Sequence, residues 1–187
     1  MRSKVMIFAL VIVMGATTAA FSQDEDDGWK DAVKLCGEEP DDPNDSIDAC
    51  TTAINSGRME GASLANMYYN RARVLMAEKR YDEAISDYDS AILNNDLDSA
   101  FYHDKGTAYR RKGDYAGAIE SYTKAIDMGF QPAFGVYFNR GVAYHYSEDK
   151  DNALQDFLRA NMLEPDNAQV RKVLKDMYNV DPDNPDN

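Results

Sequence analysis

Positive charge is scarce in this chain of 187 residues, which holds 20 lysines and arginines against 33 aspartates and glutamates, for a formal net charge of −13. A protein that binds nucleic acid needs a basic surface that displaces counterions from the phosphates. Binding to an anionic membrane surface needs basic residues as well. The composition therefore argues against both partners, and the acidic surplus is typical of a solvated outer face.

Residues that carry catalysis or bind metals are also scarce. The only histidines are His103 and His145, and neither has a cysteine or carboxylate at the spacing of a zinc site. The chain has no Gly-x-Ser-x-Gly motif and no phosphate-binding glycine loop. Its acidic C-terminal residues lack the glycine and the terminal glutamate of an EF-hand loop. We therefore predict a protein that is not an enzyme and has no metal site and no cofactor.

Only one long apolar run is present, Val5–Gly15, which follows two basic residues and precedes a series of small ones. It is shorter than the roughly 20 residues that a membrane-spanning helix needs. This pattern predicts a secretory signal peptide over residues 1–22, cut after Ser22, and a periplasmic or secreted protein without membrane insertion after cleavage. An uncleaved anchor is the alternative. The acidic residues 23–27 are expected to form a disordered linker.

A pattern of about 34 residues recurs along the rest of the chain. Tyr88 recurs as Tyr122 and Phe157, and Ala84 recurs as Ala118 and Ala153. Such a period, with small and aromatic residues in fixed positions, indicates a helical solenoid. The spacing aromatic-x3-Gly-x2-Tyr, followed by Ala-x3-aromatic-x2-Ala, resembles the tetratricopeptide repeat (TPR) family.

The resemblance implies an all-α fold, a right-handed helical solenoid of antiparallel helix pairs. The expected units are a degenerate first repeat over residues 28–57, three clear repeats over 65–98, 99–132 and 134–167, a capping helix over 168–179, and a disordered tail over 180–187. Small residues such as Gly106 and Gly141 are expected where paired helices approach closely, and the recurring aromatics are expected to fill the space between pairs. A larger residue at these positions would overpack the contact.

The two cysteines, Cys36 and Cys50, occupy positions of the first repeat that are aromatic in later repeats and point between the paired helices. An exported chain folds in an oxidising compartment, so we predict a Cys36–Cys50 disulfide that strengthens the terminal repeat. Two free buried thiols are the alternative. A redox-active pair is disfavoured because the chain has no Cys-x-x-Cys spacing.

The resemblance also implies that the first helix of each pair lines a concave groove, which binds an extended peptide or a helix of another protein. The side chains expected there are Asn66, Tyr69, Asn70, Arg73, His103, Asp104, Thr107, Arg110, Phe138, Asn139, Val142 and His145. Tyr69, His103 and Phe138 would form a stripe of flat rings. Arg73 and Arg110 would bring positive charge to an otherwise acidic surface.

This set departs from the TPR domains that hold chaperone tails in a carboxylate clamp. Those domains have lysine where this chain has Tyr69 or His103, and asparagine where it has Arg73 or Thr107. The departure argues against chaperone-tail binding. The predicted function is a non-catalytic protein–protein interaction scaffold, and the alternative is a permanent structural subunit or accessory factor of a cell-envelope assembly. The identity of the partner and the oligomeric state stay open.

Overall fold

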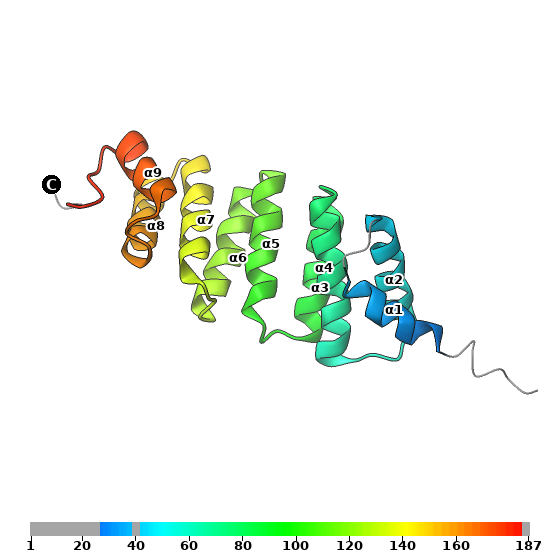
Figure 1. Cartoon of the computed structure of the whole chain (residues 1–187). Helices are drawn as coiled ribbons and strands as arrows, with labels where there is room; N and C mark the ends of the chain where they lie inside the picture. The colour runs from blue at the N-terminus through cyan, green and yellow to red at the C-terminus, as the bar shows by residue number, and fades with distance from the viewer. Residues whose placement is uncertain (1–26, 39–41, 185–187) are drawn as a thin grey trace, which may run out of the picture.

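The computed structural model describes residues 27–38 and 42–184, and the part of the chain that it describes contains nine α-helices and no strand (Figure 1). The all-α fold is as predicted. The predicted signal peptide and nearly all of the acidic linker lie outside the described residues. The helices are α1 (Gly28–Cys36), α2 (Pro43–Asn55), α3 (Gly61–Ala77), α4 (Tyr81–Asn94), α5 (Ser99–Lys112), α6 (Tyr115–Asp127), α7 (Ala133–Tyr146), α8 (Lys150–Leu163) and α9 (Ala168–Tyr178).

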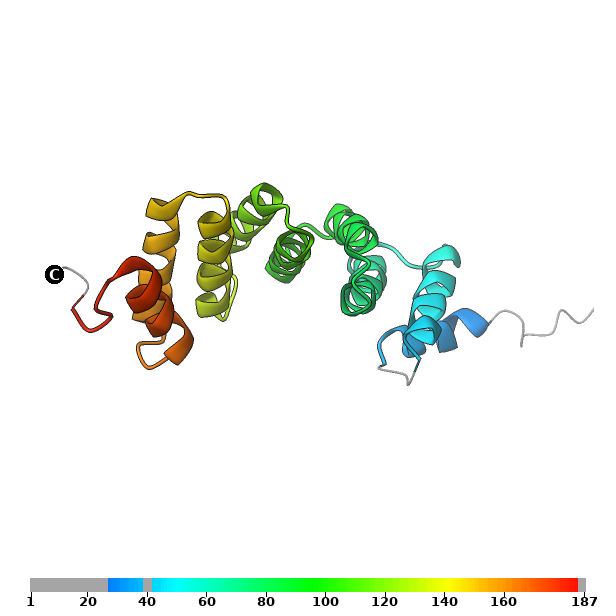
Figure 2. The same cartoon turned by 90° about the horizontal axis from the view of Figure 1, so that it is seen from above.

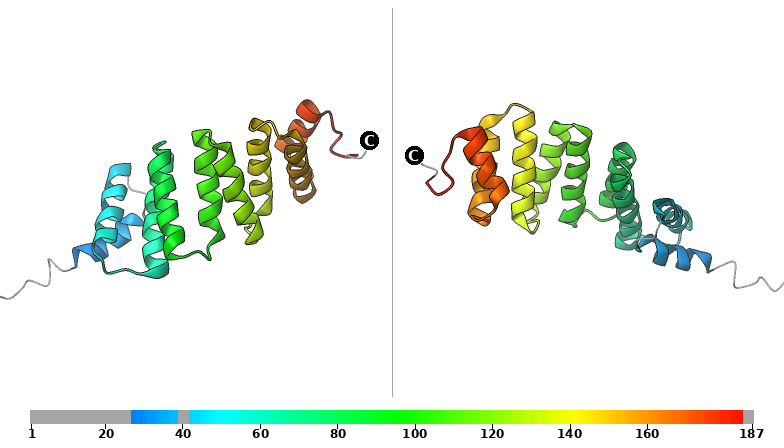
Figure 3. Two further views of the ribbon diagram at one scale, coloured as in Figure 1. Left: turned by 180° about the vertical axis from the view of Figure 1, so that it is seen from behind. Right: turned by 45° about the horizontal axis from the view of Figure 1, so that its top comes forward.

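Consecutive helices pack as pairs, α1 with α2, α3 with α4, α5 with α6 and α7 with α8. The pairs stack in chain order, and α9 packs on α8 at the C-terminal end (Figure 3). Seen from above, the array is curved, with α3, α5 and α7 on the inner side (Figure 2). We call these three the inner helices, and we call α4, α6 and α8 the outer helices.

The helix boundaries follow from local sequence. Asp98, Asp114 and Asn167 each accept a hydrogen bond from a backbone N–H of the helix that follows, which satisfies a donor that has no partner within the helix. The turn between α5 and α6 passes through Gly113 with a φ of 89°, a left-handed conformation that glycine adopts without steric cost.

Close packing between paired helices depends on residues that have little or no side chain. Tyr122 of α6 is fully buried, and a Cβ atom added to Gly106 of α5 would lie 2.8 Å from Tyr122 Cδ1. In the next pair, a Cβ on Gly141 would lie 3.0 Å from Phe157 Cε1. The aromatic side chain of each outer helix therefore lies directly against the backbone of its inner helix.

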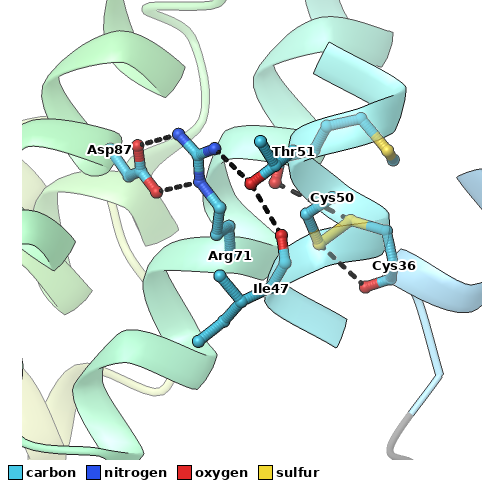
Figure 4. Close-up of a disulfide and its surroundings, with 7 residues drawn as sticks. Cys36, Ile47, Cys50, Thr51, Arg71 and Asp87 are labelled. Carbon is cyan, nitrogen blue, oxygen red and sulfur yellow. Dashed lines mark hydrogen bonds and ion pairs between the residues drawn. A yellow bond between two sulfur atoms is a disulfide. The ribbon is translucent and has the colours of Figure 1, made fainter. Parts of the chain in front are cut away.

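The first pair is joined by the Cys36–Cys50 disulfide (Figure 4). Both cysteines are buried, and they pack with Ala32, Ala49 and Met67 in a small core shared by α1, α2 and α3. The disulfide therefore lies at the contact between the first helix pair and the second.

The C-terminal residues differ in part from the expected disordered tail. The Val180 backbone N–H donates to Leu174 O, and Asn161 Nδ2 donates to Pro182 O at 3.1 Å. Arg171 donates two hydrogen bonds to Asp183, at 2.9 and 2.7 Å. Residues 180–184 thus turn back against α8 and α9, because α9 has no partner helix and leaves these groups available. Residues 185–187 lie outside the described part.

Candidate functional site: the concave groove

Two inner helices are connected across the groove by one carboxylate. Tyr69 Oη on α3 donates to Asp104 Oδ2 on α5 at 2.8 Å, and His103 Nδ1 lies 2.8 Å from Asp104 Oδ1. His103 also stacks on Phe130, with ring centroids 4.3 Å apart. His103 and Asp104, two of the four predicted groove residues on α5, are thereby fixed in place, and both oxygens of Asp104 have partners within the protein.

Tyr69 is half-buried rather than freely presented to the groove. Its ring centroid lies 5.0 Å from that of Phe101 and 5.9 Å from that of Tyr88. Burial raises the pKa of the Tyr69 hydroxyl, and the neighbouring charge of Asp104 and the hydrogen bond to it raise it further. The hydroxyl therefore stays protonated and continues to donate to Asp104.

Two depressions are lined by Arg73 and Ala77 of α3. The first has a volume of about 240 Å³ and lies between α3 and α5; its lining residues are Arg73, Met76, Ala77, Tyr88, Asp104, Thr107 and Arg111. The second has a volume of about 280 Å³ and lies between α3 and the first helix pair; its lining residues are Cys36, Gly37, Glu38, Pro43, Ser46, Asn70, Arg73, Val74 and Ala77. Arg73 and Ala77 contribute to both depressions.

The other predicted residues of α3 and α5 differ in exposure. Asn66 and Arg73 are exposed, whereas Asn70, Thr107 and Arg110 are half-buried. The Nε atom of Arg110 is buried and has no hydrogen-bond acceptor within the described residues. The polar side chains that a ligand can reach are therefore concentrated on α3 and on the C-terminal half of α5.

The fourth repeat contributes less to the groove than the sequence predicted. Phe138 is only 8% exposed and packs on Phe157, with ring centroids 5.5 Å apart, so it is not part of an exposed stripe of rings. Val142 packs against the same core. His145 Nδ1 lies 2.9 Å from Tyr178 Oη. Phe138 and Val142 differ from the prediction because they pack in the core around Phe157, and His145 differs because it contacts Tyr178 at the end of α9. Asn139, the fourth residue predicted here, is half-buried.

One set of polar residues was not singled out from the sequence. Arg71 on α3 binds Asp87 on α4 through two hydrogen bonds of 2.7 and 2.8 Å, and it also donates to Thr51 Oγ1 on α2 at 2.8 Å (Figure 4). Arg140 on α7 makes the same two bonds to Asp156 and donates to Thr123 Oγ1 at 3.0 Å.

The intervening repeat uses a different arrangement at the same positions. Lys105 on α5 takes the place of the arginine, and its Nζ pairs with Asp89 Oδ1 on α4 at 2.5 Å. Ser121 stands where the other two repeats have aspartate. In the second and fourth repeats the carboxylate lies on the outer helix of the same pair, whereas the carboxylate that pairs with Lys105 lies on the outer helix of the preceding pair. The signal that could have revealed this set is the recurrence of an arginine and an aspartate at matching repeat positions.

The described residues contain no group of three or more histidine, cysteine, aspartate or glutamate side chains placed to hold a metal ion. Within that same part of the chain, no helix is long and apolar enough to cross a membrane.

Comparison with protein-family models gives two matches, both described as tetratricopeptide repeat, over residues 63–129 and 103–168. Together they cover more than half of the chain. The chain belongs to the tetratricopeptide repeat family. The matched region runs from the third residue of α3 past the end of α8 and therefore includes nearly all of the three inner helices of the groove.

The chain matches only part of the length of each of two curated relatives. An Hsp70-Hsp90 organising protein of Plasmodium falciparum is 28% identical over 102 residues, which are 54% of this chain and 40% of that protein. A DnaJ homolog subfamily C member 7 homolog of Schizosaccharomyces pombe is 31% identical over 74 residues, which are 39% of this chain and 16% of that protein. This TPR chain thus spans less than half of each of these relatives.

Solved structures share the fold at low sequence identity. A crystal structure of MamA has a TM-score of 0.65 and 23% identity, covering 79% of this chain and 84% of that one. The first TPR of Spaghetti (RPAP3), bound to the HSP90 peptide SRMEEVD, has a TM-score of 0.60 and 21% identity, covering 66% of this chain and 97% of that one. YrrB, described as a TPR protein with an unusual peptide-binding site, also has a TM-score of 0.60, with 21% identity and coverage of 68% of this chain and 63% of that one.

Proposed function

We propose that this TPR protein is a non-catalytic scaffold that binds a peptide or a helix of another protein in its concave groove. One observation carries the proposal: two depressions meet at Arg73 and Ala77 on the inner helix α3, and polar side chains line both. Structural neighbours that hold peptides, such as the TPR domain bound to SRMEEVD, support the same use of the fold. The groove residues that differ from those of a carboxylate clamp argue against binding of chaperone tails, so the proposal does not include such tails.

Within the groove, the working region is the stretch formed by α3 and α5. The inner face of α7 is largely occupied by contacts with the core and with the C-terminal helix, as Phe138 and His145 show. A bound segment would therefore contact Asn66, Asn70 and Arg73 on α3 and would pass over the C-terminal half of α5.

We also propose that the protein works in the periplasm or outside the cell. The signal-like pattern of residues 1–22 supports this location, and so does the Cys36–Cys50 disulfide, because such bonds persist in oxidising compartments. Cell fractionation followed by determination of the mature N-terminus tests it. A mature chain that begins at Gln23 in the exported fraction agrees with the proposal, and a chain that keeps Met1 in the cytosol contradicts it.

The binding proposal is tested by blocking the groove without removing a packed side chain. Ala77 is exposed and lines both depressions, so Ala77→Trp fills them. Ala116→Trp on the outer helix α6 is the matched control, because Ala116 is also exposed. Partners cross-linked in intact cells by the wild type and by Ala116→Trp should be lost with Ala77→Trp. If Ala77→Trp still cross-links the same partners, binding does not take place in the groove and the proposal is wrong.

A second candidate is a permanent subunit or accessory factor of a cell-envelope assembly. Exposed apolar side chains at the C-terminal ends of outer helices, and in the connection that follows α4, favour it: Leu93 is 87% exposed, Leu97 84% and Met162 70%. A permanent interface would cover them, and without the partner the protein would associate with itself. A purified wild-type chain that stays monomeric at high concentration, with no gain in solubility from Leu93→Lys and Leu97→Lys, rejects this candidate.

A further inference from the structure

One position of the inner helices varies together with the aromatic residue that it faces on the outer helix. In the third repeat, Thr107 Oγ1 lies 3.0 Å from Tyr122 Oη, so the buried hydroxyl has a partner. In the fourth repeat both members are apolar, Val142 and Phe157. The second repeat combines Arg73 with Tyr88 at the matching positions.

The Arg73 and Tyr88 combination leaves a polar group without a partner. Only 1% of Tyr88 is exposed, and no other described residue forms a hydrogen bond with its hydroxyl. Tyr88 lines the 240 Å³ depression between α3 and α5. Burial is the main factor that raises the pKa of this hydroxyl, the negative charge of Asp104 raises it further, and the positive charges of Arg73 and Arg111 lower it. The hydroxyl stays protonated and is therefore a donor.

The two arginines of the depression have no carboxylate partner among the described residues, although Arg73 Cζ lies 6.0 Å from the centroid of the Tyr69 ring. No carboxylate of the described residues forms an ion pair with Arg73 or Arg111, although this chain has an excess of acid. Four other arginines do hold carboxylates, namely Arg71, Arg80, Arg140 and Arg171. Asp104 lines the same depression, but Tyr69 and His103 occupy its oxygens. The two arginines and Asp104 together give the depression a net positive charge of about one.

We propose that this depression binds one carboxylate side chain, a glutamate or an aspartate of the captured peptide, through donors from Arg73, Arg111 and the Tyr88 hydroxyl. The inference rests on the proposed function and names the ligand chemistry of one part of the groove. Hydrogen bonds between guanidinium groups and carboxylates are short and strong, and a carboxylate accepts several donors at once. The aliphatic walls formed by Met76 and Ala77 suit the methylene groups of the acidic side chain.

Binding is measured by NMR titration of the mature full chain at low salt. The probe is the acetylated and amidated peptide Ala-Ala-Glu-Ala-Ala, and the matched control peptide carries glutamine in place of glutamate. The Nε–H signals of Arg73 and Arg111 should shift with the glutamate peptide until they saturate, and they should not shift with the glutamine peptide. No saturable shift, or equal shifts with both peptides, overturns the proposal.

Two variants copy arrangements that the chain already contains and therefore keep the fold. Tyr88→Phe places in the second repeat the ring that Phe157 supplies in the fourth, and Arg73→Thr reproduces the pair of Thr107 and Tyr122. Each should weaken binding of the glutamate peptide about tenfold or more, since a hydrogen bond to a charged group is lost. Arg159→Gln on α8 removes an arginine of an outer helix that, like Arg73, has no carboxylate partner and lies over a tyrosine ring, and it should leave the affinity unchanged. Unchanged affinity in both groove variants overturns the proposal.

Inorganic phosphate, titrated under the same conditions, tests the alternative anion. If phosphate displaces the glutamate peptide at a lower concentration than the peptide itself needs, the site selects phosphate and the carboxylate assignment is wrong. Cross-linked capture then separates the two proposals. A partner that is lost with Ala77→Trp but kept with Arg73→Thr upholds groove binding and rejects the carboxylate site, whereas a partner kept by both rejects the proposed function.

Discussion

Asp156 accepts two hydrogen bonds from Arg140, at 2.7 and 2.8 Å, in a place where only 7% of the aspartate side chain is exposed. Asp87 and Arg71 form the same pair in the second repeat, where the aspartate side chain is 8% exposed. Each pair joins an inner helix to its outer helix, and each arginine also donates to a threonine on the second helix of the preceding pair. One guanidinium group thus connects three helices.

Replacing the acid of such a pair should destabilise the array. Asp156→Ala leaves Arg140 largely buried without its carboxylate, and we expect a loss of about 3 kcal/mol in the free energy of unfolding. Urea denaturation followed by circular dichroism measures it. The matched control is Asp176→Ala, which breaks the exposed pair of Lys172 and Asp176 at 3.5 Å and should cost less than about 1 kcal/mol. Equal losses in the free energy of unfolding would show that the buried pair contributes no more to stability than the exposed pair.

Removing the disulfide should loosen one end of the array rather than all of it. The bond between Cys36 and Cys50 closes a loop with a sequence separation of 14, so its loss should cost about 3 kcal/mol in the first repeat. Hydrogen exchange of the Cys36→Ala, Cys50→Ala double variant, and of the chemically reduced wild type, should speed up in α1 and α2 while α5 to α8 keep their protection. Uniform acceleration along the chain would contradict this local role.

Two glycine-to-alanine substitutions should have opposite signs. Gly106→Ala places a Cβ 2.8 Å from the buried ring of Tyr122, so we expect a loss of about 1–3 kcal/mol from overpacking. Gly135→Ala in α7 meets nothing within 4 Å, and it should stabilise the protein by about 0.5–1 kcal/mol because alanine favours the helix. Thermal melting of the two variants measures the difference. A loss of stability in both variants would indicate that the contact between Gly106 and the Tyr122 ring is not the cause of the destabilisation.

The fold should weaken at high pH because of its buried tyrosines. Burial is the main factor that raises the pKa of Tyr69, Tyr88 and Tyr122 above the ordinary value of 10.0. Above about pH 10 the unfolded chain therefore binds fewer protons than the folded chain, and the free energy of unfolding falls as the pH rises.

An ultraviolet titration of phenolate should show these three tyrosines ionising only with unfolding. Circular dichroism of the same samples measures the loss of helix. A single transition near pH 10 with no loss of helix would contradict the burial of the three hydroxyl groups.

The solenoid was predictable because its signal is repeated. Tyr88, Tyr122 and Phe157 recur at a fixed period, and the three copies together indicate which side chains pack between helices, even though each copy is loose. The disulfide was predictable for a related reason, since Cys36 and Cys50 occupy positions that later repeats fill with packed aromatics. Both predictions depend on local spacing, which the backbone of a helix pair converts directly into distance.

The groove was less predictable, because exposure depends on what each face contacts in three dimensions. Phe138 occupies the same repeat position as Tyr69, but the core around Phe157 buries it. His145 meets Tyr178, which lies 33 residues further along the chain. Charged residues pose the same difficulty, since Arg71 and Asp87 look like solvated surface residues in one repeat, and only the comparison of repeats indicates that they are a pair.

The placement of Asp89 and Asp156 also depends on the order of the repeats. Asp89 in α4 stands at the position that Thr123 occupies in α6, and Lys105 is the cation that faces it. A shorter chain that joined α4 directly to α7 would bring Asp89 and Asp156 together against the single guanidinium group of Arg140, leaving one negative charge uncompensated. Gene rearrangements that delete or shuffle these modules would therefore be selected against at the joints, even though every module on its own retains a sound helix pair.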